Sequence, residues 1–345
     1  MSPQKLVVLL LKVIALSVLW WVCFMVGGRI SGVDRPQAGA RSEAQTDIVA
    51  PSSVECPARP PTEPTSSPGG RAPAQGVDAV KAVRLLLLAC SLQAVIFSYL
   101  ILRSRWAGWK LVGTIFLTIF GVIALHTGLE SAVYLSYLSR ILPTGMTARI
   151  FLMLVVAGAI FSPLAVLIMG KMKRDSRDES PNLRLLMPAS EWLWKSLAIA
   201  VAYLVVYYTF GYFVAWRSPA VRQFYGATEL RSFFQQIGLV WSATPWMFPF
   251  QAFRGLLYMV FALPIVRMLK GRSWEAGLAI ALMLSVLGGA QLLVPNPFMP
   301  ESVSRVHLIE VMSSNFIFGW LVGWLLGRSH VPAHSPREEA LRPAP

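Results

Sequence analysis

Two pairs of a histidine and a glutamate are the residues best suited to chemistry. His126 and Glu130 are four positions apart, and His307 and Glu310 are three positions apart. Offsets of three and four place two side chains on the same face of a helix. Imidazole and carboxylate groups can bind a divalent metal or exchange protons near neutral pH. The two pairs therefore form a candidate site for metal binding or proton transfer.

The chemistry of these groups depends on whether the pairs meet. If they face one cavity, two imidazoles and two carboxylates could hold a divalent metal, whose ligands would be His126, Glu130, His307 and Glu310. Without a metal, the same groups would form a proton-linked binding pocket. If each group reaches interfacial water separately, they share no function.

Arg254 and Asn315 are further candidates for ligand binding. Arg254 opens the sixth apolar segment on the same side as the two pairs. There it could pair with Glu310, receive an anionic substrate, or act only as an interfacial anchor. Asn315 precedes the glycines of the last segment at their own four-residue spacing. The candidate ligand-binding set is therefore His126, Glu130, Arg254, His307, Glu310 and Asn315.

Several familiar catalytic motifs are absent from the sequence. It contains no HExxH zinc-protease helix, no GxSxG nucleophile elbow and no P-loop for a nucleotide. Two His/Glu pairs also fall short of a catalytic zinc set, because they offer no third strong ligand. The sequence favours a protein that binds or transports a small or lipid-linked ligand from the outer face of a membrane. The alternatives are an intramembrane metal-assisted hydrolase or transferase, and a non-catalytic subunit of a membrane complex.

The composition requires a lipid environment for most of the chain. Hydrophobic residues make up 55% of the 345 residues and charged residues only 14%, whereas soluble domains carry about a quarter charged residues. The net charge of +14 does not indicate nucleic-acid binding, because the basic residues lie in short connectors between apolar runs. The partner that the composition predicts is the lipid bilayer.

Apolar runs of near-spanning length predict an all-α bundle of about eight transmembrane helices. The predicted spans are 6–26, 83–102, 111–129, 150–169, 197–216, 255–269, 276–294 and 308–326. Two aromatic segments broken by prolines, 134–142 and 233–250, are expected at the membrane interface. Residues 1–28 are expected to form an N-terminal signal anchor, 29–79 a disordered external linker, 80–328 a seven-helix membrane domain, and 329–345 a polar cytoplasmic tail.

Lysine and arginine set the predicted topology. They are dense in three short connectors, 103–110, 171–195 and 267–272, which the positive-inside rule assigns to the cytoplasm. Eight spans then leave both termini in the cytoplasm. The absence of an N-x-Ser/Thr acceptor favours a bacterial-type inner membrane, as a multi-pass protein, over a secretory-pathway membrane.

A stripe of glycines marks the last predicted span. Gly319, Gly323 and Gly327 recur every four residues, and small residues in register let two helix backbones approach closely in lipid. The stripe predicts a packing seam, which could join this helix to its neighbours or to a partner membrane protein.

Overall fold

The computed structural model describes residues 2–33, 78–133, 145–173, 185–227, 229–295 and 299–328. Within these ranges the chain is helical and forms no strands. The expected interface segment 134–142, most of the linker (34–77) and the tail 329–345 lie outside the described residues.

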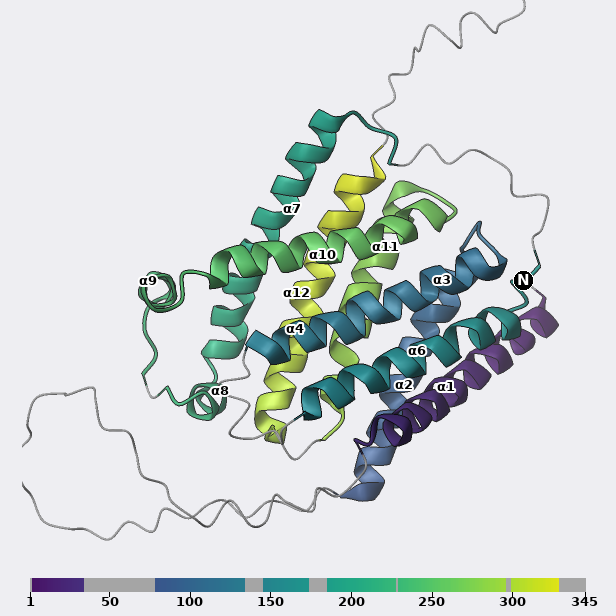
Figure 1. Cartoon of the computed structure of the whole chain (residues 1–345), viewed down its shortest axis with the longest axis horizontal. Coiled ribbons are helices and arrows are strands. Elements are labelled where there is room, and N and C mark those ends of the chain that lie inside the picture. Colours follow the sequence, from purple (N-terminus) through teal and green to yellow (C-terminus); the bar gives the residue numbers. More distant parts are fainter. Residues whose placement is uncertain are drawn as a thin grey trace, which may run out of the picture.

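Eight helices in the described part are long and apolar enough to cross a membrane, which confirms the predicted helical membrane class. Three of these spans contain short π-helical stretches, and the seventh ends in a 3₁₀ turn. The spans are α1 (Pro3–Ser31), α2 (Ala79–Leu102), α3–η2–α4 (Gly108–Thr118, Ile119–Leu125, His126–Val133), α6 (Met146–Ile168), α7–η3 (Ala189–Phe210, Gly211–Trp216), α10 (Met247–Met268), α11–η4–η5 (Ser273–Leu282, Met283–Leu287, Ala290–Leu293) and α12 (Glu301–Gly327). Figure 1 shows α10, α3–η2–α4 and α6 running in roughly one direction, and α7 and α12 crossing that direction at a steep angle.

The three basic connectors meet at one end of the bundle. The Arg105 amide donates to the Met268 carbonyl at 2.8 Å, and the Lys270 amide donates to the Arg103 carbonyl at 2.8 Å. The Gly108 amide donates to the Lys171 carbonyl at 2.9 Å. We call this the connector end of the bundle and the opposite end the site end. That the connectors share one end is what the topology prediction requires; which end is cytoplasmic stays a prediction.

The first helix is built into the bundle and does not stand apart from it. Trp20 lies between Phe97 of α2 and Phe161 of α6, with ring centroids 5.8 and 4.8 Å away. Its indole Nε1 donates to the Gln93 side chain at 2.6 Å. A Cβ at Gly27 would lie 2.5 Å from the Met153 carbonyl oxygen, so glycine allows α1 to approach α6 closely. The helix expected to be a signal anchor thus forms part of the core.

The glycine stripe of α12 rests on α11. A Cβ added at Gly323 would lie 2.4 Å from the Gly277 Cα, and one added at Gly319 would lie 2.8 Å from the Ala281 Cα. At Gly327 the carbonyl accepts a hydrogen bond from the Ser273 hydroxyl at 2.9 Å. The chain's own α11 therefore occupies this seam, which leaves no room there for a helix of another protein.

The sixth span begins earlier than the sequence suggested. It was expected from residue 255, because Pro245 and Pro249 seemed to break the segment before it, yet α10 starts at Met247. Pro249 falls in the first turn, where a backbone amide has no intrahelical partner and its loss costs little. Arg254 consequently lies seven residues inside the helix, about 10 Å from its start, and not at its end.

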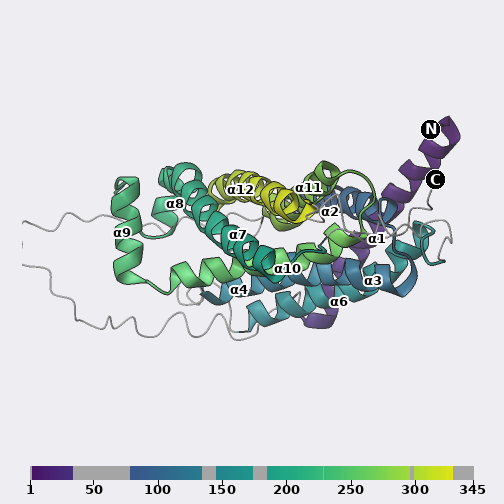
Figure 2. The ribbon, with the colours of Figure 1, turned by 90° about the horizontal axis from the view of Figure 1, so that it is seen from above.

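A short aromatic helix lies at the site end outside the bundle. This helix, α9 (Phe233–Ala243), follows α8 (Pro219–Phe224) and has no buried residue. Figures 1 and 2 show α9 at the edge of the molecule, running across the direction of the neighbouring α10. At 11 residues it is too short to span a bilayer.

Candidate functional site

Arg254 is a buried cation near the site end of α10. Its side chain is 4% exposed, and its closest ion-pair partner is the half-exposed Glu130 at 3.5 Å. One guanidinium nitrogen donates to Gln251 at 3.0 Å. The buried Nε has no hydrogen-bond partner within the described residues. Arg254 thus has fewer partners than its five donors could serve.

Aromatic rings surround the guanidinium. Its central carbon lies 5.9 Å from the Tyr203 ring and 6.0 Å from the Phe250 ring. Tyr207 and Tyr258 are close enough to interact with it electrostatically. Such rings attract a cation through their negative faces, and tyrosine hydroxyls can also bind a ligand beside the cation.

Two glycines let α10 lie close to its neighbours and so fix Arg254 in place. A Cβ at Gly255 would lie 2.6 Å from the Tyr203 Cβ in α7. A Cβ at Gly121 in η2 would lie 2.2 Å from the Phe261 ring of α10. Any larger residue at either position would move α10 relative to the helix that it touches.

The ring of His126 packs between the backbones of η2 and α10. Its Nδ1 lies 2.6 Å from the Gly121 carbonyl oxygen, and its Nε2 lies 3.4 Å from the carbonyl oxygen of Arg254. The ring stacks on Tyr258 at a centroid distance of 3.5 Å. With both nitrogens facing carbonyl oxygens, His126 is placed to position Arg254 and has no free nitrogen directed at a metal.

His307 and Glu310 contact each other directly. The His307 Nδ1 lies 2.6 Å from the Glu310 carboxylate, and the Nε2 faces the Tyr225 hydroxyl at 3.4 Å. A Cβ at Gly211 would lie 3.5 Å from a Glu310 oxygen, so the carboxylate sits beside the π-helix η3. A carboxylate on Nδ1 fixes the tautomer of a histidine and leaves Nε2 to act on another group.

Asn315 links α12 to the Arg254 surroundings. Its side chain and that of Arg254 both lie near enough to the Tyr258 hydroxyl to interact with it electrostatically. It also approaches the Leu284 carbonyl in η4 at 3.5 Å. Each of the three π-helices therefore lies beside a predicted site residue: η2 beside His126, η3 beside Glu310 and η4 beside Asn315. Such segments interrupt regular helix bonding and are frequent at functional sites.

The six predicted residues thus fall into two groups. Glu130, Arg254, His126 and Asn315 belong to one network, and His307 with Glu310 forms a separate pair that has Tyr225 as its third member. Arg254 pairs with Glu130, and the alternative pairing with Glu310 does not occur. Among the described residues, no three His, Cys, Asp or Glu side chains are grouped so that they could hold a metal. The four-residue metal site stays a prediction without geometric support.

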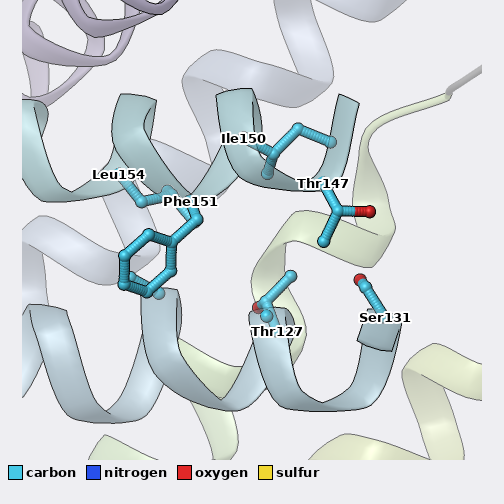
Figure 3. Close-up of a pocket in the computed structure, with 8 residues that line it drawn as sticks. Thr127, Ser131, Thr147, Ile150, Phe151 and Leu154 are labelled. Atoms are coloured by element: carbon cyan, nitrogen blue, oxygen red, sulfur yellow. The ribbon is translucent and has the colours of Figure 1, made fainter. Parts of the chain in front are cut away.

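A small pocket lies on the other side of α4. It contains about 180 Å³ of empty space, part of it open to the outside, between α4 and α6. Figure 3 shows Thr127 and Ser131 on one helix and Thr147 on the other at this pocket. Its lining includes no residue of α10, so the pocket is separate from the Arg254 site.

The tyrosines and Gln251 around Arg254 were not among the residues predicted from the sequence. Tyr203 and Tyr207 are four apart, and Gln251 and Arg254 are three apart, so helical spacing would have paired each with its neighbour. In a chain with 9 tyrosines and 18 phenylalanines, that spacing alone does not separate a site from ordinary packing. Comparison with protein-family models, with curated proteins and with solved structures gives no match to this chain.

Proposed function

We propose that this membrane protein binds an anionic group at Arg254, as the recognition step in binding or transporting a small or lipid-linked ligand. The observation that carries the proposal is a guanidinium that is 4% exposed, whose acidic partner Glu130 is 50% exposed and 3.5 Å away. A buried charge that is compensated by a half-exposed carboxylate is less stable than one in a fully buried pair, and intramembrane cations commonly serve a function.

The chemistry around Arg254 suits an oxyanion such as a phosphate or a carboxylate. A guanidinium group binds two oxygens of a planar carboxylate or of a tetrahedral phosphate through two parallel hydrogen bonds. The Arg254 Nε has no partner among the described residues, and the ion pair with Glu130 is long enough to be exchanged for a closer anion. Glu130 would then act as the resident anion that a ligand displaces. The sequence-predicted topology puts this end of the bundle at the outer face.

The test compares Arg254→Gln with Arg267→Gln. Both changes remove one positive charge from α10, but Arg267 is exposed at the connector end. The purified proteins would be tested in neutral phosphatidylcholine nanodiscs for binding of glycerol 3-phosphate, by equilibrium dialysis, and of phosphatidylglycerol, by native mass spectrometry. We expect Arg254→Gln to lose at least tenfold in affinity for one of the two, with Arg267→Gln unchanged. Equal binding by all three proteins would contradict the proposal.

A second function is favoured by the His307–Glu310 pair. A histidine whose Nδ1 is held by a carboxylate and whose Nε2 faces a hydroxyl, here that of Tyr225 at 3.4 Å, has the arrangement of a general base. It supports the alternative of an intramembrane hydrolase or transferase, in which His307 would take a proton from water or from a substrate hydroxyl. His307→Gln would then abolish turnover of a substrate while leaving anion binding at Arg254 intact. Loss of binding in His307→Gln would instead assign the pair to the anion site.

A further inference from the structure

The surface of α9 is apolar and largely exposed. Phe234 is 83% exposed and Trp241 is 62% exposed, and none of its 11 residues carries a charge. Such a helix would be unfavourable in water, because Phe234, Leu239 and Trp241 remain largely exposed. A short helix that crosses the direction of the spans at one end of the bundle suits the boundary between lipid headgroups and acyl chains.

Aromatic contacts connect this helix to the Arg254 site. Trp241 of α9 contacts Phe248 of α10 at a centroid distance of 5.1 Å. Phe248 stacks on Tyr208 at 4.8 Å. Tyr208 contacts Tyr207 at 5.2 Å, and Tyr207 contacts Tyr203 at 6.3 Å. The Tyr203 ring lies 5.9 Å from the guanidinium carbon of Arg254, so aromatic rings extend from α9 to the buried cation.

Charge argues against access by a free anion from the water side. The half-exposed carboxylate of Glu130 lies 3.5 Å from the buried guanidinium, and it repels an anion that approaches from solvent. A lipid is held in the bilayer by its chains, so its headgroup is present at high local concentration along the aromatic side. This local concentration lets a lipid-linked anion compete with the carboxylate better than a dilute dissolved one.

We infer that the ligand is a lipid with an anionic phosphate headgroup, which reaches Arg254 sideways from the bilayer past α9. This inference rests on the proposed anion site. The acyl chains would remain against the exposed rings of Phe234 and Trp241, and the phosphate would replace Glu130 at the guanidinium.

The experiment separates the lipid from its water-soluble headgroup. Phosphatidic acid in phosphatidylcholine nanodiscs and dissolved glycerol 3-phosphate carry the same phosphate monoester. Both would be measured on the wild-type protein, on Arg254→Gln and on the double variant Phe234→Ser/Trp241→Ser. The control is Trp109→Ser/Leu193→Ser, which removes two side chains, each 74% exposed, at the connector end. Because α9 contributes no buried residue, its double variant should retain the thermal stability of the wild type.

We expect the wild type to bind phosphatidic acid at least tenfold more tightly than glycerol 3-phosphate. The α9 double variant should lose this preference, whereas the control should keep it, and Arg254→Gln should bind neither. If glycerol 3-phosphate binds as tightly as the lipid and the α9 changes have no effect, the ligand is water-soluble; the lipid inference fails and the anion site stands. If neither compound depends on Arg254, both proposals fail.

A second measurement tests the position of α9 directly. A nitroxide attached at Phe234→Cys, in a chain with Cys56→Ser, should be more accessible to oxygen than to a water-soluble nickel complex, as expected inside the membrane boundary. The described cysteines, Cys23 and Cys90, are buried and would not compete for the label. Greater accessibility to nickel would place α9 in water and overturn the inference.

Discussion

At the connector end of α12, the backbone of Gly323 rests on that of Gly277. At the site end of the same helix, His307 and Glu310 face each other and Tyr225 across a polar contact. The connector end is also closed by backbone hydrogen bonds between three connectors, whereas the site end is joined by side-chain contacts around the buried Arg254. The two ends of one bundle thus differ in whether backbone or side-chain groups hold the helices together.

The difference shows how a membrane protein can be stable and still bind a polar ligand. Close contact between small residues stabilises helices in lipid, where the hydrophobic effect contributes little to helix association. Polar groups that are incompletely satisfied lower stability, so they persist where a function needs them. Substitutions at the glycine contacts of the connector end should therefore change stability most, and those at the site end should also change binding.

The largest expected effect comes from Gly323→Leu at the connector end. A Cβ there would lie 2.4 Å from the Gly277 Cα, so α11 and α12 must separate, at a cost of about 3 kcal/mol or more. We expect the midpoint of thermal unfolding in detergent to fall by several degrees. The matched control is Gly113→Leu, since a Cβ at Gly113 meets nothing within 4 Å. Equal losses in the two variants would mean that the seam is not a special contact.

His126→Ala should come next and should affect both stability and binding. It removes the hydrogen bond to Gly121 and the stacking on Tyr258, which together stabilise the fold by about 1–3 kcal/mol.

His307→Ala should destabilise the protein less than His126→Ala, because His307 is partly exposed. The effects of the two substitutions should add in the double variant, since the residues lie in separate groups. A double variant no worse than either single one would unite them in one site.

Glu130→Gln should raise the affinity of the site end for an anionic ligand. It removes the acid that pairs with Arg254, so a ligand would no longer compete with a resident carboxylate. We expect affinity for an anionic ligand to rise roughly threefold to tenfold, as for a charge near a partly screened site. Titration of phosphatidic acid against the wild type measures the change. Weaker binding would assign Glu130 to the ligand contacts themselves.

The smallest effect is expected from Arg103→Gln. Arg103 pairs with Glu275 at the connector end, but both side chains are partly exposed, and such pairs contribute about 0–1 kcal/mol. Thermal unfolding should therefore shift by no more than about one or two degrees, and anion binding should not change. A loss of thermal stability comparable to that of Gly323→Leu would show that ion pairs, and not close packing, stabilise the connector end.

The architecture was accessible from the sequence, but the depth and pairing of the site residues were not. Length and hydropathy predicted the eight spans, since these depend on bilayer thickness alone. The start of α10 was missed because Pro249 is harmless in a first turn, and Arg254 was therefore expected at the membrane surface. Spacing predicted the contact between His307 and Glu310. It could not predict the orientation of His126, which depends on the π-helix before it.

The place of Trp20 in the core has a consequence for fragments of this protein. Its indole joins α1 to α2 through Gln93, and its ring packs on both α2 and α6. Side-chain contacts within the membrane thus bind α1 to α2 and α6, and this binding does not require a continuous backbone. Residues 1–33 and 78–345, produced as two separate chains, should assemble into one bundle, and Trp20→Ala in the short chain should prevent their copurification.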